Sequence, residues 1–148
     1  MTESANSNVS ASRDLPAVVV TGGTGFLGEH LVRALVASRR FRVRVLARTR
    51  SPVLDDLRVD CVRGDVLEGP ELDLALRDGA AVFHLAGFAD LNAARSRPLE
   101  TVHANVVGTV HLLEAMRAKR VTRFLLASTV YVFSRDGGFY RCSKQACE

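Results

Sequence analysis

Two side chains near the end of the sequence have the types and spacing of a proton-transfer pair. Tyr140 and Lys144 stand four residues apart in the stretch YRCSK. On a helix this spacing places both side chains on one face. An ammonium group beside a phenol stabilises the phenolate and lowers the phenol's pKa from about 10, so the tyrosine can act as acid or base near neutral pH. The alternative is an ordinary solvated helix face.

A second candidate site lies near the start of the sequence, in TGGTGFLG. Its glycines directly follow the apolar run 17–21 and precede a helical pattern. Gly22 permits a tight turn, Gly25 lets the backbone approach a pyrophosphate, and Gly28 lets the helix pack against the strand. The helix N-terminus then faces the phosphates. We predict a dinucleotide-binding loop, the alternative being a glycine-rich turn without a ligand. The loop residues assigned to the cofactor are Gly22, Gly25, Phe26, Leu27 and Gly28.

The residue about twenty positions beyond these glycines reads the adenosine ribose in such sites, and an acidic residue there binds the 2′-hydroxyl of NAD. This chain has Arg48 instead, with Arg50 behind it, and the next acidic residue is Asp55. An arginine suits a 2′-phosphate through charge-assisted hydrogen bonds. The sequence therefore favours NADP, with NAD as the alternative. Arg48 can also be read as a solvated side chain at a strand end.

The elements that must position these residues alternate along the chain. Apolar runs of strand length are expected at 17–21, 41–47, 59–64, 80–87 and 121–129, and helical patterns at 26–36, 70–79, 98–120 and from about 139. This alternation predicts an α/β fold of Rossmann type, a doubly wound parallel sheet with helices on both faces. Residues 1–14 are rich in Ser and Asn and predict a disordered tail, and residues 15–148 predict one dinucleotide-binding domain.

Composition sets broad limits. The chain has 148 residues, of which 47% are hydrophobic and 24% charged, which suits a single globular domain. The net charge of +4 is modest, and no known nucleic-acid-binding module accompanies the arginines between 39 and 50, so we expect no nucleic-acid partner. The three cysteines have no metal-ligand spacing. Without a signal peptide or an apolar run of about 18 residues, we expect a soluble cytoplasmic protein with no membrane partner.

Taken together, the motifs resemble the extended short-chain dehydrogenase/reductase superfamily, in particular the NAD(P)-dependent epimerase/dehydratase family, over residues 16–148. The stretches that carry the resemblance are TGGTGFLG, RGDV, FHLAG, HANVVGT, LLASTVYV and YRCSK. The resemblance implies that Asp65 hydrogen-bonds the adenine amine and that Val66 packs beside the ring. It also implies that Leu85, Ala86 and Gly87 run along the cofactor. The plainer alternative for Asp65 is a loop cap.

The same resemblance assigns catalytic roles. It implies that Lys144 also holds the nicotinamide ribose and that a hydroxyl after the fifth strand hydrogen-bonds the substrate oxygen. Thr129 fits that role best, with Ser128 as the neighbouring candidate. Asn105 corresponds to a structural asparagine of the family, although it can also be read as an ordinary polar helix residue. His84 is expected to be a core histidine at a strand end and not a base.

The implied function is an NAD(P)-dependent epimerase, dehydratase or reductase acting on a nucleotide sugar or another hydroxyl or carbonyl substrate by hydride transfer. Family members continue with further strands and a substrate domain, so we expect this chain to be the N-terminal portion of a longer enzyme, incomplete at its C-terminal end. The expected partners are a small-molecule substrate and a second copy in a homodimer. The alternatives are a non-catalytic NADP-binding sensor and an inactive fragment.

Overall fold

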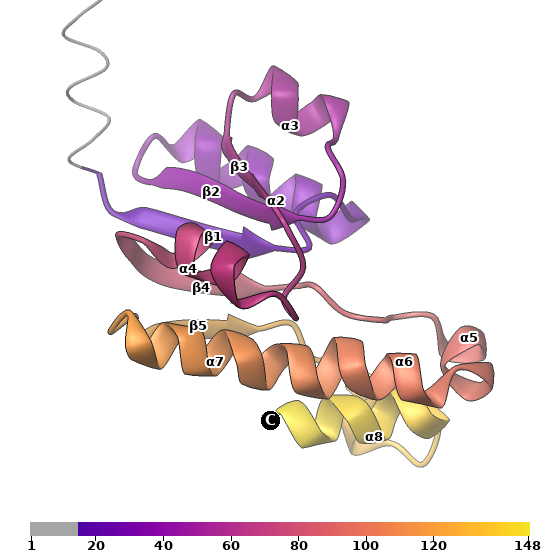
Figure 1. Cartoon of the computed structure of the whole chain (residues 1–148). Helices are drawn as coiled ribbons and strands as arrows, with labels where there is room; N and C mark the ends of the chain where they lie inside the picture. The colour runs from indigo at the N-terminus through magenta and orange to yellow at the C-terminus, as the bar shows by residue number, and fades with distance from the viewer. Residues whose placement is uncertain (1–14) are drawn as a thin grey trace, which may run out of the picture.

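The computed structural model describes residues 15–148 and shows a five-stranded parallel sheet in the order β3-β2-β1-β4-β5 (Figure 1). The strands are β1 (Ala17–Thr21), β2 (Arg42–Ala47), β3 (Asp60–Arg63), β4 (Gly79–His84) and β5 (Arg123–Leu126). The helices are α2 (Phe26–Ser38), α3 (Pro52–Asp56), α4 (Gly69–Leu76), α5 (Leu91–Ser96), α6 (Pro98–Val102), α7 (Gly108–Ala118) and α8 (Gly138–Cys147). The predicted fold class is confirmed, whereas the predicted tail at 1–14 lies outside the described residues.

Strand β1 is the centre of the sheet because both of its faces are apolar. All five of its residues are buried, and it pairs in parallel with β2 on one side and β4 on the other. The chain order of the strands reverses at this point, since β2 and β3 lie on one side of β1 and β4 and β5 on the other. In such sheets a crevice opens at the carboxyl ends of the two strands that flank the reversal.

Two apolar layers cover the two faces of the sheet, with α2 on one face and α4 and α7 on the other (Figure 1). Side chains alternate along β1, so that Val19 belongs to one layer and Val18 and Val20 to the other. On the side of α4 and α7, the layer includes Val19, Leu46, Val82, Leu112 and Met116. On the side of α2, it includes Val18, Val20, Val32, Leu35, Val45 and Leu54.

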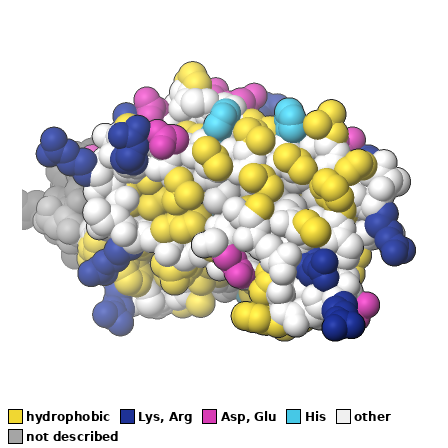
Figure 2. Space-filling view, turned by 90° about the horizontal axis from the view of Figure 1, so that it is seen from below, with side chains coloured by type: hydrophobic (Ala, Val, Ile, Leu, Met, Phe, Trp, Pro, Cys, Tyr) yellow, Lys and Arg dark blue, Asp and Glu magenta, His cyan; other side chains and the backbone are white. Residues whose placement is uncertain are grey.

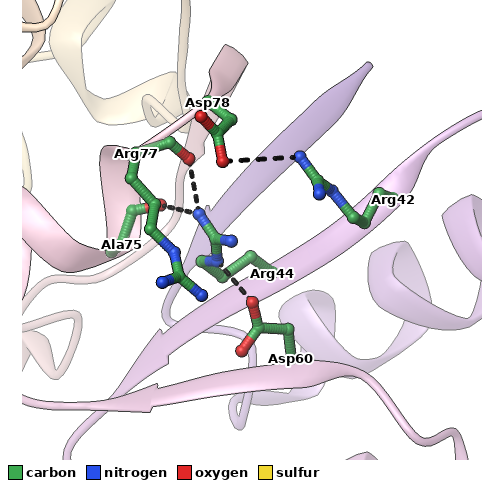
Figure 3. Close-up of polar contacts among 6 residues, drawn as sticks. All are labelled: Arg42, Arg44, Asp60, Ala75, Arg77 and Asp78. Carbon is green, nitrogen blue, oxygen red and sulfur yellow. Dashed lines mark hydrogen bonds and ion pairs between the residues drawn. The ribbon is translucent and has the colours of Figure 1, made fainter. Parts of the chain in front are cut away.

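A buried arginine ties together β2, β3 and α4 (Figure 3). Arg44 is 2% exposed, and its Nε donates to Asp60 Oδ2 at 2.7 Å. Its Nη1 donates to the carbonyl oxygens of Ala75 at 2.9 Å and Arg77 at 2.6 Å, at the end of α4. These carbonyls have no partner within the helix. One guanidinium therefore fastens both ends of the β3–α4 unit, whose connecting loop carries Asp65.

The long helix expected at 98–120 is present, but it is not uniform. Between α6 and α7 the residues His103–Val107 form a π-helical turn, η1. A single π-helical turn inside an α-helix inserts an extra residue and re-aims the side chains that follow it. Sequence periodicity averages over such a turn and does not locate it. The turn carries Asn105, which is buried.

Short elements were missed by the sequence reading, namely α3, α5 and the 3₁₀ turn η2 (Val130–Phe133). Each is too short for a helical period to show. Helix α5 depends on a cap, because Asp90 Oδ1 accepts hydrogen bonds from Asn92 N at 2.9 Å and Ala93 N at 2.8 Å. The fourth and fifth strands also end earlier than predicted, at His84 and Leu126, because the chain leaves the sheet there to form the walls of a cleft and a turn.

The face that carries α7 and α8 shows many hydrophobic side chains (Figure 2). The exposed fraction is 51% for Val110 and 41% for Leu113 on α7, and 40% for Phe139 on α8. Larger exposures occur in η2, where Phe133 is 92% exposed. These side chains are not covered by any other part of residues 15–148.

Candidate active site

A cleft of about 720 Å³ opens at the carboxyl ends of four strands. Strand–loop junctions of parallel sheets converge on one edge, so segments far apart in the sequence meet there. The residues that line it after the strands are Gly22, Thr24 and Gly25 after β1, Arg48 and Thr49 after β2, Gly64, Asp65 and Val66 after β3, and Leu85, Ala86, Gly87 and Phe88 after β4. The cleft therefore brings together most of the residues that the sequence assigns to a cofactor.

The glycine loop is compact because two of its glycines have no room for a side chain. Gly22 has φ +71°, and a Cβ there would lie 2.6 Å from the backbone N of Ala86. A Cβ at Gly28 would overlap the carbonyl oxygen of Gly22. Gly25 is the N-cap of α2 and makes no side-chain cap. The loop thus has the expected tight turn and close helix packing, with the first turn of α2 beginning at the cleft.

Phe26 and Leu27, also assigned to the cofactor, lie elsewhere. They begin α2 with exposed fractions of 85% and 61%, and neither lines the cleft. Helical geometry accounts for this placement, because side chains in the first turn radiate away from the axis while the backbone N–H groups point along it. Only the backbone of these two residues is therefore placed to face a ligand at the helix N-terminus.

Arg48 and Asp65 form the outer end of the cleft. The Nε of Arg48 lies 3.9 Å from Asp65 Oδ2, and the arginine side chain is 81% exposed. Such an exposed pair contributes little stability, which leaves the guanidinium available to another anion. Asp65 also accepts a hydrogen bond from Leu67 N at 3.1 Å through Oδ1, so it caps its own loop as the plainer reading expected. The two roles use different oxygens.

The opposite wall was not predicted. It is formed at the start of the long helix by Arg97, Glu100, His103 and Ala104. Arg97 lies over the ring of Phe88, with Cζ 4.8 Å from the centroid, and its Nη1 pairs with Glu100 Oε2 at 3.1 Å. The sequence contained one signal, since Pro98 marks a helix start and places Arg97 at its N-terminal boundary. The position of Pro98 does not show that this end of the helix lies at the cleft.

His84 is a buried histidine at the end of β4, as expected. It is 1% exposed, its Nδ1 lies 2.6 Å from Thr21 Oγ1, and its Nε2 lies 3.0 Å from Thr109 Oγ1. Burial, together with the charge of Lys144, lowers the pKa of His84 to about 4. The imidazole is therefore neutral at physiological pH and has no open path to a ligand.

Asn105 connects the cleft to α8. It is 2% exposed, and its Oδ1 accepts a hydrogen bond from Phe88 N at 2.6 Å. Its Nδ2 donates to the Phe88 carbonyl at 3.2 Å and to Ser143 Oγ at 2.8 Å. The neighbouring Gly108 allows close packing, because a Cβ there would lie 2.7 Å from Val66 Cγ2. Asn105 thus has the structural role that the resemblance implied.

Tyr140 and Lys144 both lie on α8, and their environments differ from the sequence expectation. Burial raises the pKa of Tyr140, and a hydrogen bond with Thr129 only partly opposes this. Lys144 is 7% exposed, and burial lowers its pKa. The expected lowering of the Tyr140 pKa by Lys144 is therefore wrong for this structure, in which loss of solvation of the phenol outweighs any effect of the ammonium.

The two hydroxyl candidates differ in their surroundings. Thr129 is the N-cap of η2, where Oγ1 accepts a hydrogen bond from Tyr131 N at 3.4 Å, and its hydroxyl is near enough to Tyr140 to act against the rise in that phenol's pKa. Ser128 instead donates its hydroxyl to Glu148 at the surface. Of the two hydroxyls, only that of Thr129 influences the pKa of Tyr140. None of Ser128, Thr129, Tyr140 and Lys144 lines the cleft that the described residues form.

Within residues 15–148, no three His, Cys, Asp or Glu side chains are grouped to hold a metal ion. The same part of the chain has no helix that is both long and apolar enough to cross a bilayer.

A family model described as the NAD dependent epimerase/dehydratase family matches residues 18–146. The chain belongs to this family. The resemblance read from the motifs is thereby confirmed, and the parallel sheet with its cleft at the strand reversal is the fold of the family's N-terminal part.

Curated relatives of this family member have several activities. The chain is 42% identical over 136 residues to a ceramide reductase of Caulobacter vibrioides, covering 88% of this chain and 40% of the relative. It is 39% identical to human 3 beta-hydroxysteroid dehydrogenase type 7, covering 73% and 31%. It is 34% identical to the UDP-glucose 4-epimerase of Erwinia amylovora, covering 80% and 38%. The chain thus spans well under half the length of these relatives.

Solved structures of similar proteins have the same fold over most of this chain. The protein MoeE5 in complex with UDP-glucose and NAD superposes with a TM-score of 0.77 at 29% identity, covering 88% of this chain and 46% of that one. UDP-glucose 4-epimerase from Brucella ovis in complex with NAD gives 0.78 at 26% identity, covering 88% and 45%. Both of these neighbours bind NAD.

Proposed function

We propose that the cleft binds a nicotinamide dinucleotide and that this chain supplies the cofactor-binding and proton-transfer parts of an oxidoreductase. The observation that carries the proposal is the cleft itself, in which four strand ends and a glycine loop enclose about 720 Å³ at the reversal of strand order. Ligand pockets typically have volumes of about 300–1,000 Å³. The NAD complexes of MoeE5 and the Brucella epimerase support this assignment.

The residues present fit such a cofactor. Gly22 and Gly28 exclude side chains from the loop, and no side chain caps α2 at Gly25, so the first N–H groups of the helix remain for a phosphate. At the outer end, the Asp65 carboxylate can accept from an adenine amine and Arg48 can bind a ribose phosphate. The cleft therefore offers helix N–H groups, a carboxylate and a guanidinium, and a dinucleotide has groups complementary to each of these.

When bound, the nicotinamide supplies or accepts a hydride. We propose that Tyr140 exchanges the proton with the substrate oxygen. Thr129 lies beside the phenol, and Lys144 lies on the same helix. Because burial raises the pKa of Tyr140, the phenol is protonated at neutral pH. It is suited to donate a proton to an oxygen that gains charge, which is the direction of carbonyl reduction. Arg48, which favours NADP, supports the same direction.

The first experiment is a calorimetric titration of the chain with NADPH and, separately, with NADH. We expect NADPH to bind more tightly and Arg48→Ala to weaken NADPH binding by about tenfold or more with little change for NADH. The matched control is Arg50→Ala, which removes a neighbouring exposed arginine that pairs with Asp55 and does not line the cleft. Equal affinity for both dinucleotides in the unaltered chain would contradict the choice of NADP but not the cleft.

A non-catalytic cofactor-binding module is the second candidate. The observation that favours it is that Tyr140, Lys144, Thr129 and Ser128 do not line the cleft in this structure. The two candidates differ in one result, namely whether bound NADPH is oxidised in the presence of carbonyl substrates. Binding without turnover in a protein of the relatives' full length would favour the module.

For the substrate we propose a nucleotide sugar, with a steroid-like or other lipid alcohol or carbonyl compound as the alternative. MoeE5 binds UDP-glucose, and one relative is an epimerase of UDP-glucose, which supports the first class. The ceramide reductase and the hydroxysteroid dehydrogenase support the second. A panel containing one member of each class, followed at the absorbance of NADPH, decides between them.

A homodimer also stays a prediction, to be checked by light scattering.

A further inference from the structure

A chain of hydrogen bonds runs from the cleft wall to the long helix, with His84 in its middle. The backbone N–H of Ala86, a residue of the cleft, donates to Thr21 Oγ1 at 3.2 Å, and this oxygen lies 2.6 Å from His84 Nδ1. On the other side of the ring, Nε2 lies 3.0 Å from Thr109 Oγ1. Thr109 in turn donates to the carbonyl oxygen of Asn105 at 2.6 Å. All three linking side chains are at most 2% exposed.

The order of donors and acceptors along this chain determines the tautomer of the imidazole. Thr21 Oγ1 already accepts a hydrogen bond from Ala86 N. Among the described residues, His84 Nδ1 is the acceptor available for the hydroxyl proton of Thr21. Thr109 gives its own proton to the Asn105 carbonyl, so its oxygen is left to accept from the ring. A neutral ring with its proton on Nε2 satisfies every group, whereas the other tautomer leaves the Thr21 hydroxyl proton without an acceptor.

The series of hydrogen bonds also returns to the cleft. The backbone carbonyl of Asn105 is the last acceptor in this series. The side-chain amide of the same residue hydrogen-bonds both the N–H and the carbonyl of Phe88. The cleft segment after β4 is therefore held at two points, at Ala86 through Thr21 and at Phe88 through Asn105. Gly22 packs against this segment, since a Cβ on it would meet Ala86 N at 2.6 Å.

We propose that His84 is a positioning residue for the dinucleotide cofactor, and that its Nε2–H tautomer holds the Leu85–Phe88 segment at its distance from the glycine loop. His84 does not line the cleft, and it acts through the Thr21 hydroxyl and the Ala86 amide. The inference rests on the proposed function, because the position of this segment matters for activity only if the cleft binds a dinucleotide. The series of hydrogen bonds through His84 links the cleft to the π-helical turn. Through Asn105 and Ser143 it also reaches the helix of Tyr140 and Lys144.

The test combines three measurements on the whole chain. Nitrogen-15 NMR of the histidine rings at neutral pH reports the tautomer, hydrogen exchange reports the Ala86 amide relative to the core amide of Val19, and calorimetry reports the Kd of NADPH. The variant is Thr109→Val, which removes the hydroxyl and keeps the volume, and Thr109→Ser is the conservative rescue. Thr101→Val is the matched control, because Thr101 is also fully buried and also donates to the carbonyl four residues earlier.

We expect the Nε2–H tautomer in the unaltered chain. In Thr109→Val we expect the Ala86 amide to exchange about tenfold faster relative to Val19 and the Kd to rise about tenfold, with both values restored in Thr109→Ser and unchanged in Thr101→Val. An Nδ1–H or doubly protonated ring at neutral pH overturns the proposal, and so does an unchanged Ala86 exchange in Thr109→Val. The tautomer needs no variant, so an unfolded variant still leaves a decisive result.

The proposed function can fail separately. If the unaltered chain binds neither dinucleotide, the function of the cleft is wrong for this chain. The tautomer and the Ala86 exchange then still decide whether His84 holds the segment after β4.

Discussion

Asn105 donates a 2.8 Å hydrogen bond from Nδ2 to Ser143 Oγ, across 38 positions of sequence. Ser143 is the residue before Lys144, so this bond fixes the helix of the proposed proton-transfer pair against the π-helical turn. The Ser143 hydroxyl accepts from Asn105 and donates to the Tyr140 carbonyl at 2.7 Å. Both polar groups are nearly inaccessible to solvent, so no water can replace the bond between them when one of them is removed.

Asn105→Ala should therefore lower the free energy of unfolding by about 2–4 kcal/mol and loosen α8 more than the sheet. It removes three hydrogen bonds, so that the N–H and carbonyl of Phe88 lose their side-chain partner and the Ser143 hydroxyl loses its donor. The measurement is urea unfolding, combined with hydrogen exchange of α8. Asn92→Ala is the matched control because Asn92 is exposed on α5. A loss of stability equal to that of the control would show that the amide is not a structural hub.

Gly28→Ala should prevent the glycine loop from closing on α2. The added methyl group would overlap the Gly22 carbonyl oxygen, which is backbone and cannot move aside without opening the turn. We expect a loss of more than about 3 kcal/mol of stability or failure to fold, together with loss of dinucleotide binding. Gly69→Ala in α4 is the control, since a Cβ there meets no atom within 4 Å. Both variants are compared by thermal unfolding, and a stable Gly28→Ala protein that binds NADPH normally would refute the close packing.

Arg44→Met should cost about 3–5 kcal/mol of stability, as expected when one partner of a buried charged network is lost. The change leaves the carbonyls of Ala75 and Arg77 and the carboxylate of Asp60 without their donor (Figure 3). Denaturant unfolding measures the effect, and Arg33→Met on the exposed side of α2 controls for loss of an arginine. Equal stability of the two variants would mean that hydrophobic packing replaces the guanidinium fully.

His84 should make the protein less stable as the pH falls from 6.5 towards 4. The folded-state pKa is about 4 and the ordinary value is 6.5, so between these values the unfolded chain takes up a proton that the folded chain does not. Stability is therefore complete above pH 6.5 and decreases on acidification, by at most about 3 kcal/mol. Lys144 is the charged neighbour that adds to the burial effect.

The measurement for His84 is the free energy of unfolding at several pH values in this range for the unaltered chain and His84→Gln. The variant should lose this part of the slope, while the slope from carboxylates remains in both. His111→Gln, at an exposed position of α7, should keep the full slope. Parallel pH profiles for all three proteins would show that the ring does not stay neutral.

Local patterns in the sequence were sufficient for the sheet, the glycine loop and the family. An uninterrupted apolar run such as AVVVT can only be buried on both faces, and Gly22 and Gly28 occupy positions that no other residue fits. These features depend on covalent geometry and on the period of the side chains, both of which are written in neighbouring residues. The expected place of His84 in the core follows from the same kind of evidence.

Tertiary structure decided the features that depend on neighbours distant in sequence. No local pattern shows that Arg97 forms a cleft wall, that Asn105 lies in a π-helical turn, or that Arg44 caps α4. The direction of the Tyr140 pKa was misjudged for the same reason, because the spacing to Lys144 gives a distance along one helix but not the solvent that the fold removes from the phenol. Hydrogen-bond partners and desolvation are set by atoms that meet only after the chain has folded, and these determine the chemistry of the site.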